Sequence, residues 1–533
     1  MSKSEKKNHK NTTEPQEKVL TRYDLKMQRR REQKKKEERN KRIASAAGIL
    51  LLIGLVCWLV SFPVRSWLTV HGTYIVVADE KVSRVEFDYN YYTVLNNYIS
   101  TNGYLLSYMG IDLSGDLSKQ MYSDTLSWKD YFDEMAVKNL LTGKAMRKDM
   151  EAAGFAYDET EDYERFVKAL EEAAAASGVS LKEYIKEFYG PYATMNRVEL
   201  YIRENLKTSA YLEAVAKDNA PSDDEIQAYY EENRDNYDCV DYHMITVNAE
   251  LPTEPTELAD PVEETDGTAS GDRDDTAYTP SQAEIDAAMA IAKAEAEALQ
   301  ATVAAEGEAH ENATASSLNS VNYLVSDWLF DSAREKGDTT VIEYSYANCY
   351  YVVSFDGRYI DPTVSVNMRV ILTEDGNGQE ILDEWAAGEA TEESFARIAD
   401  KYNDPTTFAE KGGLIEEIEA GLLEEEIAEW LEDGARVYGD TAVIAPADHS
   451  ETYVFYYIGK GDPVWKVDIR GILTESFKTE YVRSLSEGVT VEDPHHNLNY
   501  LKVRAEQKAA EAAAAENGGN VSEDGSSESS SAE

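Results

Sequence analysis

The chain has 533 residues, and its 101 Asp and Glu side chains outnumber its 52 Lys and Arg side chains, giving a formal net charge of −49. Its 3 cysteines are too few for a disulfide-stabilised scaffold. No CxxC pair or cluster of His and Cys occurs, so we expect neither a structural metal nor a cofactor. The acid excess also argues against nucleic acid as a partner.

An uncharged apolar run extends from Ile43 to Val64. About 20 such residues are enough for an α-helix to cross a bilayer, and only a helix satisfies its own backbone polar groups there. A cleaved signal peptide is the alternative. However, the small residues at 44–47 precede the apolar run instead of following it, which favours an uncleaved anchor. We therefore expect residues 43–64 to be a transmembrane helix in contact with the lipid bilayer.

The two sides of this run differ sharply in charge. Residues 1–42 contain 16 Lys and Arg against 7 Asp and Glu, whereas the rest of the chain contains 36 against 94. The positive-inside rule places residues 1–42 in the cytoplasm and the bulk of the chain outside a plasma membrane. The basic tail could bind nucleic acid, but a topogenic, lipid-adsorbed tail is the favoured interpretation.

Residues 65–220 have the pattern of a helical domain. Residues 70–79 alternate like a strand, and Ser83 with Glu86 forms a capping box that opens a long helix. Helical patterns then continue to about Lys217. Most of the many Tyr and Phe side chains should form the core, and the remainder could line a surface for extended apolar peptide. The candidate peptide-binding residues are Tyr91, Tyr92, Tyr98, Phe188 and Tyr189.

The next segment has mixed helix and strand signals. Ser222 and Glu225 form a second capping box before a helix, and a strand follows at 240–247. Residues 251–281 are rich in Pro, Thr and acids, which is typical of a solvated insertion. A helix is predicted at 284–305, and an apolar helix and two strands are predicted within 321–359.

A similar order of elements then recurs, which indicates an internal repeat. The predicted elements are a strand at 364–374, helices around 381–385 and 394–404, a double-glycine turn at Gly412-Gly413, a helix at 423–431, and strands at 441–445 and 453–458. The two glycines imply positive φ or a close backbone approach.

The segment SDDEIQAYYEEN, running into a strand with an internal His, resembles the entry into the parvulin domain of SurA- and PrsA-like extracytoplasmic foldases. Residues 412–461 are similar to the second half of that domain. The resemblance implies a fold with a single N-terminal transmembrane helix, an exterior α-helical chaperone-like domain and two α+β parvulin-like domains. The implied divisions are 1–42, 43–64, 65–220, 221–360 with its insertion at 251–281, 361–463, a C-terminal segment at 464–503 that returns to the helical domain, and a disordered acidic tail at 504–533.

Parvulins isomerise X-Pro bonds with a His on the first strand, a His on the facing closing strand, and a Cys or Asp nearby. In the first copy His243 matches the first position, but Tyr351 stands where the second His would fall. In the second copy the positions are Arg369 or Val370, and Val454. The catalytic set is therefore incomplete, and a packing role for His243 is favoured over a catalytic one.

The same alignment bears on the two exterior cysteines. If His243 faces Tyr351, Cys239 and Cys349 are about 20 Å apart along the strands, too far for a disulfide. We therefore expect two free thiols, with Cys349 buried beside the sheet and Cys239 near the domain entrance.

Three functions are compatible with the sequence. The favoured one is a membrane-anchored extracytoplasmic chaperone or foldase whose partners are unfolded or nascent secreted polypeptides. The alternatives are an active peptidyl-prolyl isomerase acting through the first parvulin-like domain, and a non-catalytic scaffold of the cell envelope. The sequence leaves the oligomeric state open.

Overall fold

The computed structural model describes residues 64, 67–106, 108, 110–113, 115–257, 278–303, 311–373, 376–404, 411–447 and 450–518. The predicted basic tail lies outside these residues, as does the predicted membrane helix apart from Val64. Most of the acidic insertion and residues 519–533 also lie outside them. Within the described ranges, no helix combines the length and the apolar character needed to cross a bilayer.

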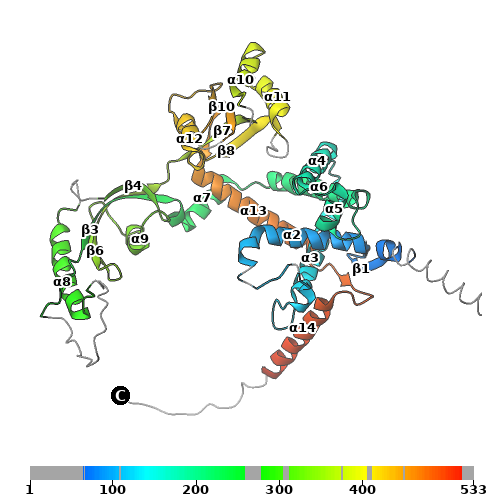
Figure 1. Ribbon diagram of the computed structural model, residues 1–533, viewed down its shortest axis with the longest axis horizontal. Coiled ribbons are helices and arrows are strands. Elements are labelled where there is room, and N and C mark those ends of the chain that lie inside the picture. Colours follow the sequence, from blue (N-terminus) through cyan, green and yellow to red (C-terminus); the bar gives the residue numbers. More distant parts are fainter. Residues whose placement is uncertain are drawn as a thin grey trace, which may run out of the picture. The chain divides into compact units, whose positions relative to one another are not determined.

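The chain divides into two compact units, each assembled from separated segments. Figure 1 shows their helices and strands, coloured along the sequence. Unit 1 comprises Met1–Lys144, Lys182–Tyr201 and Gly488–Glu533, and unit 2 comprises Ala145–Leu181 and Ile202–Glu487. Residues 65–220, expected as one domain, are thus shared between the units.

Unit 1 contains a small sheet of order β11-β1-β2 and several helices. Its elements are β1 Thr73–Val77, β2 Glu80–Ser83, α2 Arg84–Leu106, η1 Leu117–Lys119, the first part of α3 Trp128–Ala153, α5 Leu181–Tyr189, the start of α6 Met195–Asp218, β11 Val491–Glu492 and α14 Asn499–Gly518. The predicted capping box at the start of α2 is confirmed in its first half, since the Glu86 backbone N–H donates to Ser83 Oγ at 3.1 Å. The Glu86 carboxylate instead pairs with Lys144 at 2.7 Å.

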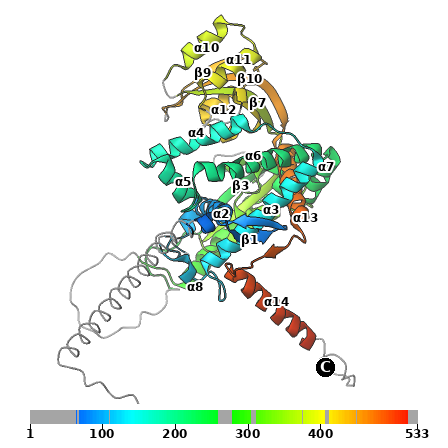
Figure 2. The same ribbon diagram turned by 90° about the vertical axis from the view of Figure 1, so that its right-hand side faces the viewer.

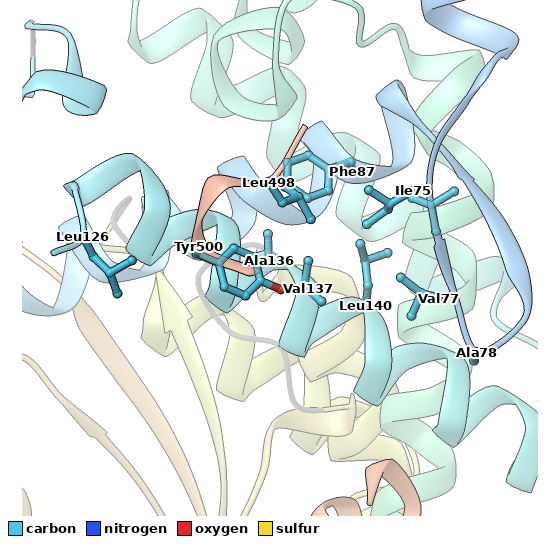
Figure 3. Close-up of a cluster of buried hydrophobic side chains, with 11 residues drawn as sticks. Ile75, Val77, Ala78, Phe87, Leu126, Ala136, Val137, Leu140, Leu498 and Tyr500 are labelled. Carbon is cyan, nitrogen blue, oxygen red and sulfur yellow. The ribbon is translucent and has the colours of Figure 1, made fainter. Parts of the chain in front are cut away.

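The C-terminal segment completes the core of unit 1. Strand β11 pairs antiparallel with β1, with Val76 opposite Glu492. Leu498 and Tyr500 are buried against side chains from β1, α2 and α3, as Figure 3 shows. The expected return of the C-terminal segment to the N-terminal region is therefore confirmed for these residues, although 464–487 belong to unit 2.

Helix α14 corrects the expected disordered tail. The helix continues to Gly518, so the expectation of disorder is wrong for 504–518. The sequence EQKAAEAAAAEN explains the difference, because Ala, Glu, Gln and Lys have high helix propensity and α14 starts from the packed residues of unit 1.

Unit 2 contains two four-stranded antiparallel sheets. The first has the order β4-β3-β6-β5. Its strands are β3 Asp238–Asn248, β4 Glu311–Ser317, β5 Thr339–Tyr344 and β6 Cys349–Ile360. Helix α8 (Gln282–Leu299) covers one face through a cluster that includes Ile245 and Val352. Helix α9 (Tyr323–Leu329) covers the other through a cluster that includes Met244 and Val353.

The second sheet has the order β8-β7-β10-β9, which repeats the topology of the first. Its strands are β7 Val364–Thr373, β8 Leu414–Ile418, β9 Thr441–Ile444 and β10 Thr452–Pro463. Helices α10 Gly378–Ala387 and α11 Glu392–Tyr402 pack on one face, and α12 Glu425–Glu432 packs on the other. In both sheets the first and last strands are the central pair, so the predicted internal repeat is confirmed at the level of topology.

The double-glycine turn is confirmed in its geometry. Gly412 and Gly413 have φ of 64° and 62°. A Cβ on Gly413 would lie 2.2 Å from the Val370 carbonyl oxygen, so no other residue fits there without displacement of the backbone.

The remaining helices of unit 2 include α4 Thr160–Ala176, α7 Asp223–Glu232 and α13 Val464–Ser486. The Ser222–Glu225 capping box of α7 is confirmed. Helix α13 packs on α7 through Ile469, Ile226 and Tyr230, which are all buried.

Candidate functional site

His243 lies on the central strand β3 of the first sheet, opposite Ser354 of β6. Its Nε2 is 2.7 Å from Oδ2 of Asp356, and the side chains of His243 and Asp356 are 15% and 26% exposed. Ser354 is completely buried, and within the described residues its Oγ has no hydrogen-bond partner. The His–Asp contact resembles the base and orienting group of many active sites. However, a buried Ser354 is closed to a substrate.

The expected facing of His243 and Tyr351 is wrong. Tyr351 pairs with Thr246, three positions along β3 or about 10 Å from the His243 position. His243 shares a face with Ile245, which packs towards α8, whereas Tyr351 packs towards α9. The two side chains therefore project from opposite faces of the sheet and do not form a pair.

The second sheet has core residues at the corresponding positions. Val370 and Val454 are both fully buried, in separate clusters on opposite faces. Arg369 is 3.0 Å from Glu392 and donates to the Gly412 carbonyl oxygen at 3.0 Å, which holds the double-glycine turn against β7. These contacts indicate a structural role for this arginine.

Cys239 and Cys349 are free, as predicted. Cys239 lies opposite Tyr359 and Cys349 lies opposite Asn248, so they occupy the two ends of the central strand pair. The large separation of the two cysteines along the strands agrees with the prediction. The predicted pairing of β3 with β6 differs by three residues from the observed one, in which His243 lies opposite Ser354. Both cysteines are buried, and burial together with the nearby Asp361 carboxylate raises the pKa of Cys239 to about 11. Such a thiol is unreactive at neutral pH.

The predicted peptide-binding residues of α2 lie within aromatic packing. The ring of Tyr98 contacts those of Phe132, Trp128 and Tyr131 of α3, with centroid distances of 5.4, 5.8 and 5.9 Å. Tyr91 lies 6.2 Å from Phe132 and 5.5 Å from Tyr92. All three of these tyrosines are half-buried.

The two candidates from α5 also pack on α2. Tyr189 is buried and stacks on Tyr89 at 4.9 Å. Asn96 Nδ2 donates to the Phe188 carbonyl oxygen at 2.9 Å. A Cβ on the next residue, Gly190, would lie 2.8 Å from the Tyr92 ring, so glycine is what allows this approach. The five candidates therefore share one packed region, in which only part of each half-buried ring is accessible.

A more accessible apolar surface of unit 1 lies at the end of α2 and in the following loop. We call it the exposed aromatic patch, and its residues are Tyr104, Leu105, Tyr108, Leu113, Met121 and Tyr122. Tyr104 and Tyr108 are 78% and 81% exposed, with their rings 6.0 Å apart. In the loop that holds Leu113 and Met121, two hydrogen bonds of 2.8 Å join Asp112 and Gln120.

The sequence contained one signal for this patch, the segment GYLLSYMG, in which apolar side chains continue past the point where the helical pattern weakens. Exposed apolar groups gathered in this way mark interaction surfaces. Sequence reasoning missed the patch because Tyr and Leu in a helical pattern are usually core residues.

Within the residues that the structure describes, no group of three or more His, Cys, Asp or Glu side chains is arranged to hold a metal ion. Comparison with protein-family models finds no match to this chain, and comparison with curated protein sequences finds none either.

Proposed function

We propose that this chain is a membrane-anchored extracytoplasmic chaperone that holds unfolded secreted polypeptides. Residues 43–64 would anchor it, and unit 1 would contact clients through the exposed aromatic patch. The observation that carries the proposal is the exposure of Tyr104 and Tyr108, 78% and 81%, on a chain with a net charge of −49. The acidic surface keeps a carrier soluble while the patch binds apolar segments.

The repeated sheets support the place of the chain among SurA- and PrsA-like foldases. In both four-stranded sheets of this chain, the first and last strands form the central pair. In unit 1, Leu498 and Tyr500 of the C-terminal segment pack into the core formed by the N-terminal strands and helices. In this proposal the two α+β domains are parvulin-like modules without the catalytic pair. They serve as spacers or as further contacts for clients.

Suppression of aggregation tests the holding function. The full chain in detergent should suppress aggregation of a reduced, unfolding model protein, and Tyr104→Ser with Tyr108→Ser should remove most of this activity. The matched control is Tyr346→Ser with Tyr323→Ser, because these tyrosines of unit 2 are 90% and 71% exposed. Equal activity of the two double variants would contradict the assignment of the client surface.

Residual isomerase activity is the second candidate function, and the 2.7 Å contact of His243 with Asp356 favours it. Since His243 and Tyr351 project from opposite faces, we expect the full chain to change the cis/trans rate of an X-Pro peptide very little. His243→Ala should leave that rate unchanged. A substantial rate that His243→Ala abolishes would reverse the order of the two proposals.

A further inference from the structure

A groove of about 520 Å³ lies between helices α7 and α13 of unit 2. Figures 1 and 2 both show these helices beside each other. Lys466 Nζ is 2.7 Å from Asp223 Oδ1, and the rings of Tyr230 and Trp465 are 5.2 Å apart. These contacts, together with the buried Ile226 and Ile469, hold the helices in place on one side of the groove.

The groove is lined by apolar and acidic side chains. Its apolar lining consists of Pro221, Ala228, Tyr229, Leu473 and Phe477. Its charged lining consists of Glu225, Glu232 and Glu480, and the remaining two lining residues, Asn219 and Ser476, are neutral. Among the residues that the structure describes, no Lys, Arg or His lines it.

The lining carboxylates differ in how far neighbouring cations neutralise them. Glu480 is paired with Arg483 at 2.6 Å. Glu225 accepts from the Ser222 backbone N–H at 2.8 Å, and its hydrogen bonds with Ser222 lower its pKa. Glu232 is exposed and forms no ion pair with any of the described residues. The lining therefore has uncompensated negative charge beside apolar surface.

We infer that this groove binds an extended polypeptide segment in which apolar side chains are flanked by Lys or Arg. The apolar side chains would cover Ala228, Leu473 and Phe477, and the cations would lie against Glu225 and Glu232. This volume lies within the range of about 300 to 1,000 Å³ that is usual for ligand-binding clefts. The negative lining disfavours an acidic segment. This inference goes beyond the proposed function, because it concerns a different surface and requires no holding activity at the exposed aromatic patch.

Peptide binding to the full chain in detergent tests this inference. The probe is a fluorescent peptide with a central Phe-Leu and two lysines on each side. One comparison peptide has glutamates in place of the lysines, and another has two serines in place of Phe-Leu. We expect the lysine peptide with Phe-Leu to bind at least about tenfold more tightly than either comparison peptide. Binding should weaken but persist from about 0.1 M to about 1 M salt, since salt screens charge and not apolar contact.

Two variants with matched controls locate the binding. Ala228→Lys puts a cation and extra volume on an exposed lining position, and should weaken binding about tenfold or more. Its control is Gln227→Lys, at the neighbouring exposed position that does not line the groove. Glu232→Gln should weaken binding about two- to fivefold, the scale of one exposed ion pair, whereas Asp224→Asn should not.

Equal affinity of Ala228→Lys and Gln227→Lys would overturn the location, and equal binding of the lysine and glutamate peptides would overturn the charge preference. Tyr104→Ser with Tyr108→Ser should keep its peptide affinity. Peptide affinity therefore tests the groove, and suppression of aggregation tests the holding function, so that either proposal can be contradicted without the other.

Discussion

At the scale of single residues, the buried carboxyl group of Asp133 in helix α3 makes the stability of unit 1 depend on pH. Asp133 is 1% exposed, and its neighbours include Lys129, Asp130 and Arg84. Burial raises the pKa of Asp133 to about 6, although Lys129 acts in the opposite direction. The folded state therefore holds this proton more strongly than the unfolded chain, in which the carboxyl has its ordinary pKa near 3.8.

This shift predicts a stability that falls as pH rises. Below about pH 3.8 the carboxyl is protonated in both states. Between there and about pH 6 only the folded state keeps the proton, so roughly 3 kcal/mol of the free energy of unfolding is lost. Asp133→Asn should remove this loss, because the amide does not ionise.

The measurement is the urea midpoint for hydrogen exchange of α3 peptides in the full chain at several pH values. The difference between wild type and Asp133→Asn should change across the pH 4 to 6 window, with the variant gaining relative stability at the higher pH. Asp88 is buried in the same region and its pKa is also raised, but it is present in both proteins and largely cancels. A constant difference at every pH would show that Asp133 titrates normally.

At the scale of elements, unit 1 is stabilised by contacts between its N-terminal strands and helices and the C-terminal segment that contains β11. Strand β11 forms one edge of the β11-β1-β2 sheet, and Asn497 Nδ2 donates to the Tyr74 carbonyl oxygen at 2.8 Å. Leu498, at 3% exposure, fills the space between β1 and helices α2 and α3. A fragment that ends at residue 220 lacks these contacts, which is why the holding assay uses the full chain.

Leu498→Ala should destabilise unit 1 by about 2 to 5 kcal/mol, the usual cost of the lost burial and of the resulting cavity. Lys502→Ala is the control, since Lys502 is exposed on the same segment and has only a surface ion pair with Glu506. Urea-dependent hydrogen exchange of α2 and α3 peptides measures the change. If both variants behave like wild type, the C-terminal segment does not contribute to this core.

Secondary structure that depends on local sequence was predicted well at this scale. The caps at Ser83 and Ser222 and the two glycines at 412–413 lie where the sequence places them, because each depends on neighbours within a few residues. Strands β4 and β8 were not predicted. Their sequences, ENATASS and LIEEI, lack the alternation of apolar and polar residues that predicts a strand.

At the scale of the whole molecule, the contrast between a basic tail and an acidic remainder predicts the topology. Protease added to intact protoplasts should digest the chain after about Arg65 and leave residues 1–42 protected, because Lys and Arg near a membrane segment are retained in the cytoplasm. Epitope tags at the two termini, followed by immunoblotting, provide the measurement. Detergent-lysed protoplasts are the control, in which both tags should be lost. Protection of the C-terminal tag in intact protoplasts would contradict the predicted orientation.

The sequence by itself determined features that arise from short-range patterns: most of the helices and central strands, the internal repeat, the caps at Ser83 and Ser222 and the double-glycine turn. Only the tertiary structure decided which residues share a face or an edge. Both faces of β3 and β6 are buried, so the hydrophobic pattern alone does not select their register. The bulge between Asp241 and Tyr242 accompanies the register that places His243 opposite Ser354 and not Tyr351. Likewise, hydropathy does not separate the packed Tyr98 from the exposed Tyr104, since their burial depends on whether α3 covers them. The pairing of β11 with β1 joins residues more than 400 positions apart, and a local pattern contains no information about such a contact.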